Sequence, residues 1–202
     1  MYAFTVVGSK GTRDEVMELG FQLSVVLLEA GWQGYSGNAP GMDKVLNRAM
    51  LKTNAFNGYI FLPWPKFETR DLPDRCFDSF TITTPIGEEC DSVIKELIPW
   101  YDKLSQGPRK LHSRNVKQIK GKDLKTLSNL VIHSAKGKTS SKPQGGTRTA
   151  VVLGQKLNVP TFNLRFYLER VALQIHLKTK YDIDVSETIK SLGDKDWPDK
   201  GF

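Results

Sequence analysis

The sequence predicts an α/β fold, a three-layer arrangement in which helices cover both faces of a mostly parallel β-sheet. Short apolar stretches rich in β-branched residues alternate with segments whose apolar residues recur at helical spacing, and glycine-containing turns separate the two. The 202 residues are enough for one domain with a small appendage. Because helical crossovers join parallel strands, the carboxyl ends of the strands share one edge of the sheet.

The expected strands are short apolar runs that end at glycine, proline or polar residues. In order along the chain they span residues 2–7, 32–36, 58–63, 127–134 and 159–164. The turns after these strands are expected to face one crevice beyond the sheet, which is where proteins with open α/β sheets bind their ligands.

The expected helices are segments in which apolar residues lie three or four positions apart. They span residues 12–31, 43–52, 86–104, 113–117, 146–157 and 166–178. Thr12 and Glu15 have the spacing of a capping box, which predicts that the first helix begins at Thr12. The alternation of these helices with the strands is typical of a Rossmann-like domain.

Two regions interrupt this alternation. Residues 64–85 combine prolines, aromatic residues and mixed charge, so we interpret 64–106 as an insertion-like excursion that begins with a long loop over the strand ends. We expect a Rossmann-like domain over 1–178 and a C-terminal extension over 179–202. The tail of that extension is polar and is expected to be loose unless Trp197 and Phe202 dock.

Positive charge is concentrated in one block. Residues 103–148 hold twelve lysines and arginines and a single acid, Asp123, whereas the whole chain has a formal net charge of +7. Such asymmetry indicates an anionic partner, with nucleic acid as one possibility and a solvated basic loop as the alternative. The block contains no Phe, Trp or Tyr, so it lacks the stacking residues that binding of single-stranded nucleic acid favours.

Several classes of protein are excluded by composition. Cys76 and Cys90 are the only cysteines and form no C-x-x-C pair, which argues against a zinc site or a disulfide framework. No apolar run approaches the roughly 20 residues that span a bilayer. The N-terminal residues are typical of a strand rather than a signal peptide. We therefore expect a cytoplasmic protein that binds no metal, no cofactor and no membrane.

Three turns are candidates for binding phosphate. The first turn is Gly8-Ser9-Lys10-Gly11, the second is Ser36-Gly37-Asn38-Ala39-Pro40-Gly41-Met42-Asp43, and the third is Gly145-Gly146-Thr147. Each is expected to lie between a strand and a helix, where unpaired N–H groups and the helix dipole favour an anion. Neither a P-loop nor a G-x-G-x-x-G pattern is present, which argues against an ordinary ATPase or NAD-dependent dehydrogenase.

The predicted nucleotide-binding residues come from these turns and from the arginine beside the third. They are Gly8, Ser9, Lys10, Ser36, Gly37, Gly41, Asp43, Gly145, Gly146, Thr147 and Arg148. Asp43 allows two interpretations: it stabilises the dipole of its own helix, or its carboxylate accepts hydrogen bonds from a ribose or a base.

These motifs resemble the SLOG superfamily, which includes the Rossmann-like domain of DprA and the LOG phosphoribohydrolases. The Ser36-Gly37-x-Ala39-x-Gly41-x-Asp43 pattern is the more specific part and resembles the DprA branch. The stretch Asn115-x-x-Gln118-Ile119-x-Gly121-x-Asp123-Leu124, followed by Gly-Gly-Thr, also looks like small DprA-like proteins of bacteriophages. The resemblance implies nucleotide binding and a homo-oligomer, and for DprA itself binding of single-stranded DNA.

The chain departs from the LOG pattern P-G-G-x-G-T-x-x-E, whose glutamate takes part in N-glycosidic cleavage. Arg148 stands at the third glycine, and Val151 and Val152 fall around the glutamate position, where valine cannot serve as an acid. The catalytic residues are therefore unknown; among the remaining acids Asp43 and Glu68 are candidates, and so is Asp71.

Binding of a nucleotide or a nucleotide-derived small molecule, by a sensor or sequestering protein, is the preferred interpretation. An enzyme that cleaves an N-glycosidic bond of a nucleotide is the alternative. A DprA-like protein that binds single-stranded DNA is the second alternative.

Overall fold

The computed structural model describes residues 1–55, 58–74, 76, 81–83, 88–137 and 144–197. Its strands form a single sheet in the order β4-β3-β2-β1-β5-β6, and every neighbouring pair is parallel. The strands are β1 (Ala3–Gly8), β2 (Gln33–Ser36), β3 (Tyr59–Leu62), β4 (Thr81–Thr83), β5 (Leu130–Ser134) and β6 (Thr161–Asn163). The predicted Rossmann-like α/β fold with a mostly parallel sheet is confirmed.

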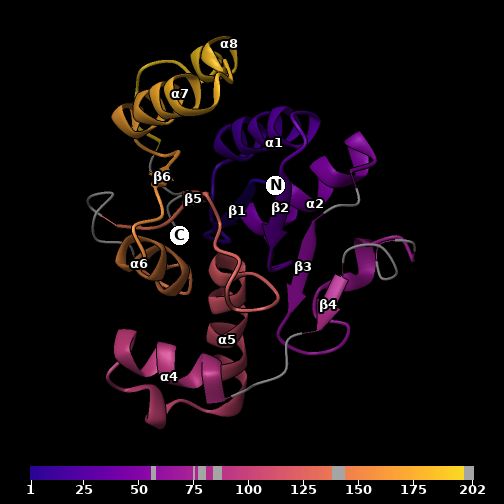
Figure 1. Cartoon of the computed structure of the whole chain (residues 1–202), viewed down its shortest axis with the longest axis vertical. Helices are drawn as coiled ribbons and strands as arrows, with labels where there is room; N and C mark the ends of the chain where they lie inside the picture. Colours follow the sequence, from indigo (N-terminus) through magenta and orange to yellow (C-terminus); the bar gives the residue numbers. More distant parts are fainter. Residues whose placement is uncertain (56–57, 75, 77–80, 84–87, 138–143, 198–202) are drawn as a thin grey trace.

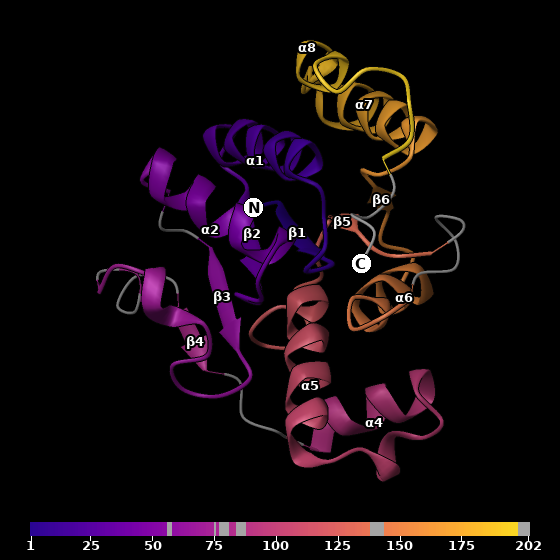
Figure 2. The same ribbon diagram turned by 180° about the vertical axis from the view of Figure 1, so that it is seen from behind.

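Helices cover both faces of this sheet, as Figures 1 and 2 show from opposite sides. One face carries α1, α2 and α7, and the other carries α4, α5 and α6. The helices are α1 (Asp14–Glu29), α2 (Met42–Thr53), α4 (Glu88–Leu97), α5 (Gln106–Lys120), α6 (Arg148–Lys156), α7 (Tyr167–Tyr181) and α8 (Ser186–Lys190). None of the helices in the described part of the chain is long and apolar enough to cross a membrane.

Side chains that alternate along the strands divide the core into two parts. Phe4 and Val6 of β1 pack toward α1 and α2, whereas Val7 packs with α5 and α6. Because the sheet is covered on both faces, both sets of side chains are withdrawn from water, which explains why the strands read as apolar runs.

The chain order places a switch point between β1 and β5. From β1 the chain builds outward through β2 and β3 to β4, and it then crosses back to place β5 on the other side of β1. The loops after β1 and β5 therefore leave the sheet toward opposite faces and open a crevice at this point.

The capping box predicted for the first helix is wrong. Helix α1 begins at Asp14, and no side chain caps it. The Thr12 hydroxyl lies instead 2.7 Å from the Ser9 carbonyl oxygen and 3.0 Å from the Ser134 hydroxyl, so it joins the first turn to the end of β5. A buried tertiary partner has replaced the local one.

The boundaries of several other elements differ from the predictions. The interval 64–85 is not only loop, because it contains the short 3-10 helix η1 (Thr69–Asp71) and the edge strand β4. The helix expected over 113–117 is longer, since α5 begins at Gln106. Helix α7 continues to Tyr181, beyond the boundary expected at 178, and α8 was not predicted.

Part of the C-terminal tail docks on the domain. The buried guanidinium of Arg170 donates to the carbonyl oxygens of Leu164, Gly193 and Lys195 at 2.7–2.9 Å. The N–H of Trp197 donates to the Arg165 carbonyl oxygen at 2.7 Å, so the tail follows the end of β6. Phe202 lies outside the described residues.

We expect His133 of β5 to make the stability of the protein depend on pH. Its side chain is buried, its Nδ1 has no partner among the described residues, and burial lowers its pKa from 6.5 to about 3. Below pH 6.5 the His133 ring is protonated in the unfolded chain but stays neutral in the folded protein, so the free energy of unfolding falls as the pH falls toward 3. The loss is up to about 1.4 kcal/mol per pH unit.

Urea denaturation of the wild type and of His133→Leu between pH 7 and 4 measures this contribution. The variant should lose stability less steeply over that interval, because the other titrating groups are common to both proteins. Parallel curves of stability against pH would contradict the assignment.

Candidate functional site

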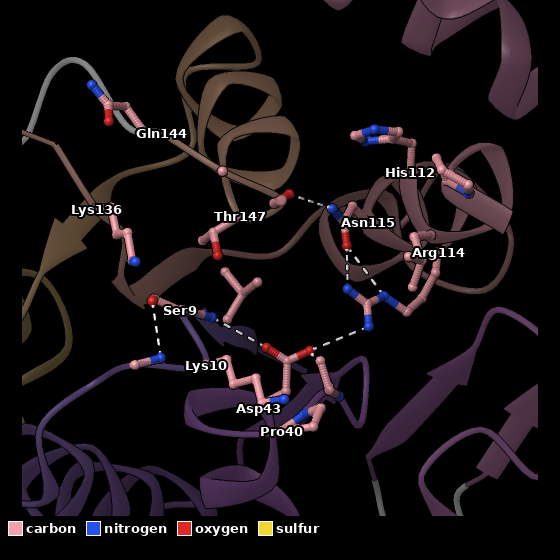
Figure 3. Close-up of a pocket in the computed structure, with 18 of the residues that line it drawn as sticks. Ser9, Lys10, Pro40, Asp43, His112, Arg114, Asn115, Lys136, Gln144 and Thr147 are labelled. Carbon is pink, nitrogen blue, oxygen red and sulfur yellow. Dashed lines mark hydrogen bonds and ion pairs between the residues drawn. The ribbon is translucent and has the colours of Figure 1, made fainter. Parts of the chain in front are cut away.

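A cavity of about 460 Å³ lies at the carboxyl end of the sheet, at the switch point between β1 and β5. Its size falls within the roughly 300–1,000 Å³ of sites for small molecules. All three turns contribute to its wall, together with one side of α5 and the loop after β3 (Figure 3). The lining residues are Val7, Gly8, Ser9, Lys10, Gly11, Ala39, Pro40, Asp43, Phe67, Pro108, Leu111, His112, Arg114, Asn115, Lys136, Gln144, Gly145, Gly146 and Thr147.

A buried ion pair lies in the wall of the cavity. Arg114 of α5 places Nη1 3.6 Å from Oδ2 of Asp43, which is in the first turn of α2, and both side chains are more than nine-tenths buried. The two oxygens of Asp43 also accept hydrogen bonds from the N–H groups of Gly8 at 3.1 Å and Ala39 at 3.4 Å. Asp43 thus holds the first turn against the second.

Burial and the charge of the partner shift the pKa of each member of this pair in opposite directions. Burial raises the pKa of Asp43, while Arg114 and the two N–H groups lower it. Burial likewise lowers the pKa of Arg114, and the charge of Asp43 opposes that change. Each charge depends on the other, since an isolated charge at this depth would be strongly disfavoured.

The ion pair continues into the third turn through Asn115. Nε and Nη2 of Arg114 donate to Oδ1 of Asn115 at 3.2 and 2.7 Å, which fixes the orientation of its amide. The Nδ2 group of Asn115 then donates to the Gly146 carbonyl oxygen at 2.9 Å. A continuous chain of contacts therefore runs from Gly8 to Gly146 and joins all three turns (Figure 3).

The N–H groups of the first turn are largely occupied. Gly8 donates to Asp43, Ser9 donates to the Ser134 carbonyl oxygen at 2.8 Å, and Gly11 donates to the Ser9 hydroxyl at 3.2 Å. The first turn lines the cavity as predicted, but most of its main-chain donors are directed into the protein.

The third turn differs from the first. The N–H groups of Gly145, Gly146 and Thr147 have no acceptor among the described residues. Gly145 has φ +75°, a conformation that L side chains rarely adopt, and Thr147 is the N-cap residue of α6. Three consecutive unpaired donors at the N-terminus of a helix, in the wall of a cavity, form a favourable site for an anion.

Three predicted residues of the second turn shape the site without lining the cavity. The Ser36 hydroxyl donates to the Asp43 carbonyl oxygen at 2.7 Å, and the Gly37 carbonyl oxygen accepts from Arg114 at 2.9 Å. Gly41 has φ +92°, and a Cβ there would lie 2.6 Å from the Ser9 carbonyl oxygen. The conformation and the close packing both require glycine at this position.

The remaining candidates lie away from the cavity. Arg148 is turned toward α4, where its Nη1 lies 3.4 Å from the Leu97 carbonyl oxygen. Glu68 is exposed, and Asp71 pairs with Lys44 at 2.7 Å beside a smaller hollow. Val151 and Val152 are on α6 and do not line the cavity either.

The three arginines of the basic block 103–148 have partners within the protein. Arg114 is buried, Arg109 donates to two main-chain carbonyl oxygens, and Arg148 reaches α4. Lys138 and Lys142 lie outside the described residues. Several of the charges that suggested a nucleic-acid surface in the sequence thus have local structural partners.

Sequence reasoning missed the side chains that α5 and the β5 loop bring to the cavity: His112, Arg114, Asn115 and Lys136. Asn115 belonged to a stretch with family resemblance, whereas no pattern in the sequence marked His112 as part of a site. Among the described residues, no group of three or more His, Cys, Asp or Glu is placed to hold a metal ion.

We expect the Asp43–Arg114 pair to stabilise the protein as a unit. Asp43→Asn or Arg114→Gln leaves a buried charge without its partner, so each should lower the free energy of unfolding by about 3 kcal/mol. The double variant should lose clearly less than the sum of the two, and urea denaturation measures all three. Asp71→Asn, at an exposed ion pair, is the control and should have no measurable effect. Strictly additive losses would show that the pair is not coupled.

Among solved structures, the chain is similar in fold to the X-ray structure of DNA processing protein A (DprA) from Streptococcus pneumoniae. The TM-score is 0.49 and the sequence identity is 14%. The match covers 80% of this chain and 49% of the other, so this chain spans about half the length of that neighbour. No protein-family model matches the sequence, and no curated protein matches it. The likeness concerns the arrangement of the chain, and the function is argued from the site.

Proposed function

We propose that the cavity binds a nucleotide or a nucleotide-derived small molecule, with a phosphate group at the third turn. The observation that carries this proposal is that the N–H groups of Gly145, Gly146 and Thr147, at the start of α6, have no acceptor among the residues that the structure describes. Main-chain donors combined with a helix dipole bind phosphate without a dedicated cationic side chain.

The charge of the cavity wall supports an anionic ligand. Lys10 and Lys136 both line the cavity, one from the first turn and one from the loop after β5. Asp43 is the one acid among the described lining residues, and Arg114 compensates its charge. The electrostatic potential of the wall is therefore positive, which attracts phosphate.

The apolar part of the wall supports a ligand that is more than a phosphate ion. Pro40, Phe67, Pro108 and Leu111 line the same cavity. A nucleoside offers a flat ring of matching character, whereas inorganic phosphate would leave these side chains uncovered.

The state of the acids favours binding over N-glycosidic cleavage. Both oxygens of Asp43 already accept hydrogen bonds, Glu68 lies outside the cavity, and Val151 and Val152 supply no acid. The protein therefore fits the role of a sensor or sequestering protein better than that of a hydrolase.

Gly146 is the position at which the proposal is tested. It is exposed, its φ is outside the left-handed region, and a Cβ there meets no atom within 4 Å, so larger residues fit without strain. Gly146→Asp and Gly146→Asn differ in charge but hardly in size. Two negative charges about 5 Å apart, here the Asp carboxylate and the phosphate, repel by about 3 kcal/mol at an effective dielectric constant of about 20. The Asp variant should bind at least about tenfold more weakly than the Asn variant.

Mass spectrometry of small molecules that co-purify with the wild type identifies the ligand, and calorimetry with nucleoside monophosphates measures the affinities. Equal affinity of the Asp and Asn variants would overturn the placement of the phosphate. Binding of a single-stranded oligonucleotide but of no nucleotide would overturn the proposal in favour of the DNA-binding alternative. Release of free base from a nucleotide by the wild type would favour the enzyme.

A further inference from the structure

His112 lies in the wall of the cavity, next to the third turn. It is on α5, two and three residues before Arg114 and Asn115, and all three side chains line the cavity (Figure 3). Its Nδ1 lies 2.8 Å from the hydroxyl oxygen of Thr149, which is in the first turn of α6. The imidazole is therefore anchored to the helix that begins at the phosphate site.

The contact with Thr149 leaves the other ring nitrogen for a ligand. Thr149 is buried, and its hydroxyl has no other partner among the described residues, so it is able to donate to Nδ1 of a neutral imidazole. When Thr149 donates in this way, the proton of the neutral ring is on Nε2, which has no partner in the described part of the chain. A neutral imidazole in this tautomer is a hydrogen-bond donor toward the cavity.

The same contact tolerates a positive charge on the ring. When Nδ1 gains a proton it becomes a donor, and the Thr149 hydroxyl turns to accept the hydrogen bond. A carboxylate would favour the charged ring and a main-chain N–H the neutral one, but a hydroxyl suits both states. The anchoring of His112 is thus compatible with a change of protonation.

The charges around His112 keep it neutral while the cavity holds no anion. Burial and the charge of Arg114 lower its pKa below the usual 6.5. Lys10 and Lys136 line the same cavity, Arg148 lies at the start of α6, and Asp43, the acid in this wall, is already paired with Arg114. An anion bound at the third turn would add a negative charge near the ring and so favour its protonated form.

We propose that His112 donates a hydrogen bond from Nε2 to a terminal phosphate monoester held at the third turn, and that the ring gains a proton as this phosphate binds. This inference rests on the proposed function and deepens it by naming the class of phosphate. A monoester has three non-bridging oxygens and carries up to two negative charges near neutral pH, whereas a diester has two such oxygens and one charge. The three N–H groups and His112 can be shared among the three non-bridging oxygens of a monoester, whereas a diester offers them two oxygens and half the charge.

Calorimetry with adenosine 5′-monophosphate tests whether a proton is taken up on binding. Comparison with cyclic adenosine 3′,5′-monophosphate tests the preference for a monoester over a diester, because the two probes share base and sugar. At pH 7, titrations in buffers of different ionisation enthalpy should show uptake of a fraction of a proton per monophosphate bound. His112→Gln should lose most of that uptake. The matched control His176→Gln, on α7 and outside the cavity, should retain it. The monophosphate should bind at least about tenfold more tightly than the cyclic diester.

Inorganic sulfate does not titrate near neutral pH, so a proton that is taken up when sulfate binds must go to the protein and not to the ligand. Its affinity should rise about three- to tenfold from pH 8 to pH 6 in the wild type and stay flat in His112→Gln. In the wild type, the NMR signal of the His112 ring should titrate at a higher pH when sulfate or the monophosphate is bound. This last measurement needs no variant and so does not depend on how well His112→Gln folds.

The results distinguish a failure of this inference from a failure of the proposed function. If the monophosphate binds and Gly146→Asp abolishes binding, but the His112 signal does not shift, the role of His112 is overturned and the nucleotide site stands. Equal affinity for the monophosphate and the cyclic diester overturns the preference for a monoester. If no nucleotide binds or Gly146→Asp has no effect, the proposed function itself is overturned.

Discussion

The candidate site depends on one buried interaction, the ion pair between Asp43 and Arg114. Asp43 accepts hydrogen bonds from the first and second turns, and Arg114 carries the contact through Asn115 to the Gly146 carbonyl oxygen. Three loops that are far apart in the sequence are thereby held around one cavity. Two opposite charges at this depth are stable only together, so the same electrostatics that hold the pair also fix the distances between the turns.

This arrangement gives the glycine turns different tasks. In the first turn most main-chain donors are used inside the protein, because Asp43 and Ser134 accept two of them. In the third turn Asn115 donates to a carbonyl oxygen, and three N–H groups have no acceptor in the described part of the chain. An anion at the first turn would have to compete with a buried carboxylate, whereas one at the third turn would accept from N–H groups that no described residue uses. The physical case for ligand binding therefore rests on the third turn.

Much of the fold was predictable because it depends on periodicity. Apolar runs and helical spacing located β1, β2, β3, β5, β6, α1, α2, α6 and α7 to within a few residues. The errors occur where tertiary contacts outweigh local signals. Thr12 bonds to the end of β5 instead of capping α1, and β4 is a strand because it adds to the open edge beside β3. Of the site, the residues on glycine turns were predicted, since turns after parallel strands must share one edge.

The sequence alone determined the α/β class, the edge of the sheet at which the turns gather, and the absence of the glutamate expected in a LOG-type enzyme. Only the tertiary structure decided which side chains complete the cavity. Arg114 counted as one charge in a basic block, yet it is buried against Asp43. Arg148 stood beside the third turn, yet it reaches α4, while His112 faces the cavity from α5. A pattern along the chain fixes which face of an element is apolar, but the partner of a buried polar group is fixed by the packing of distant elements.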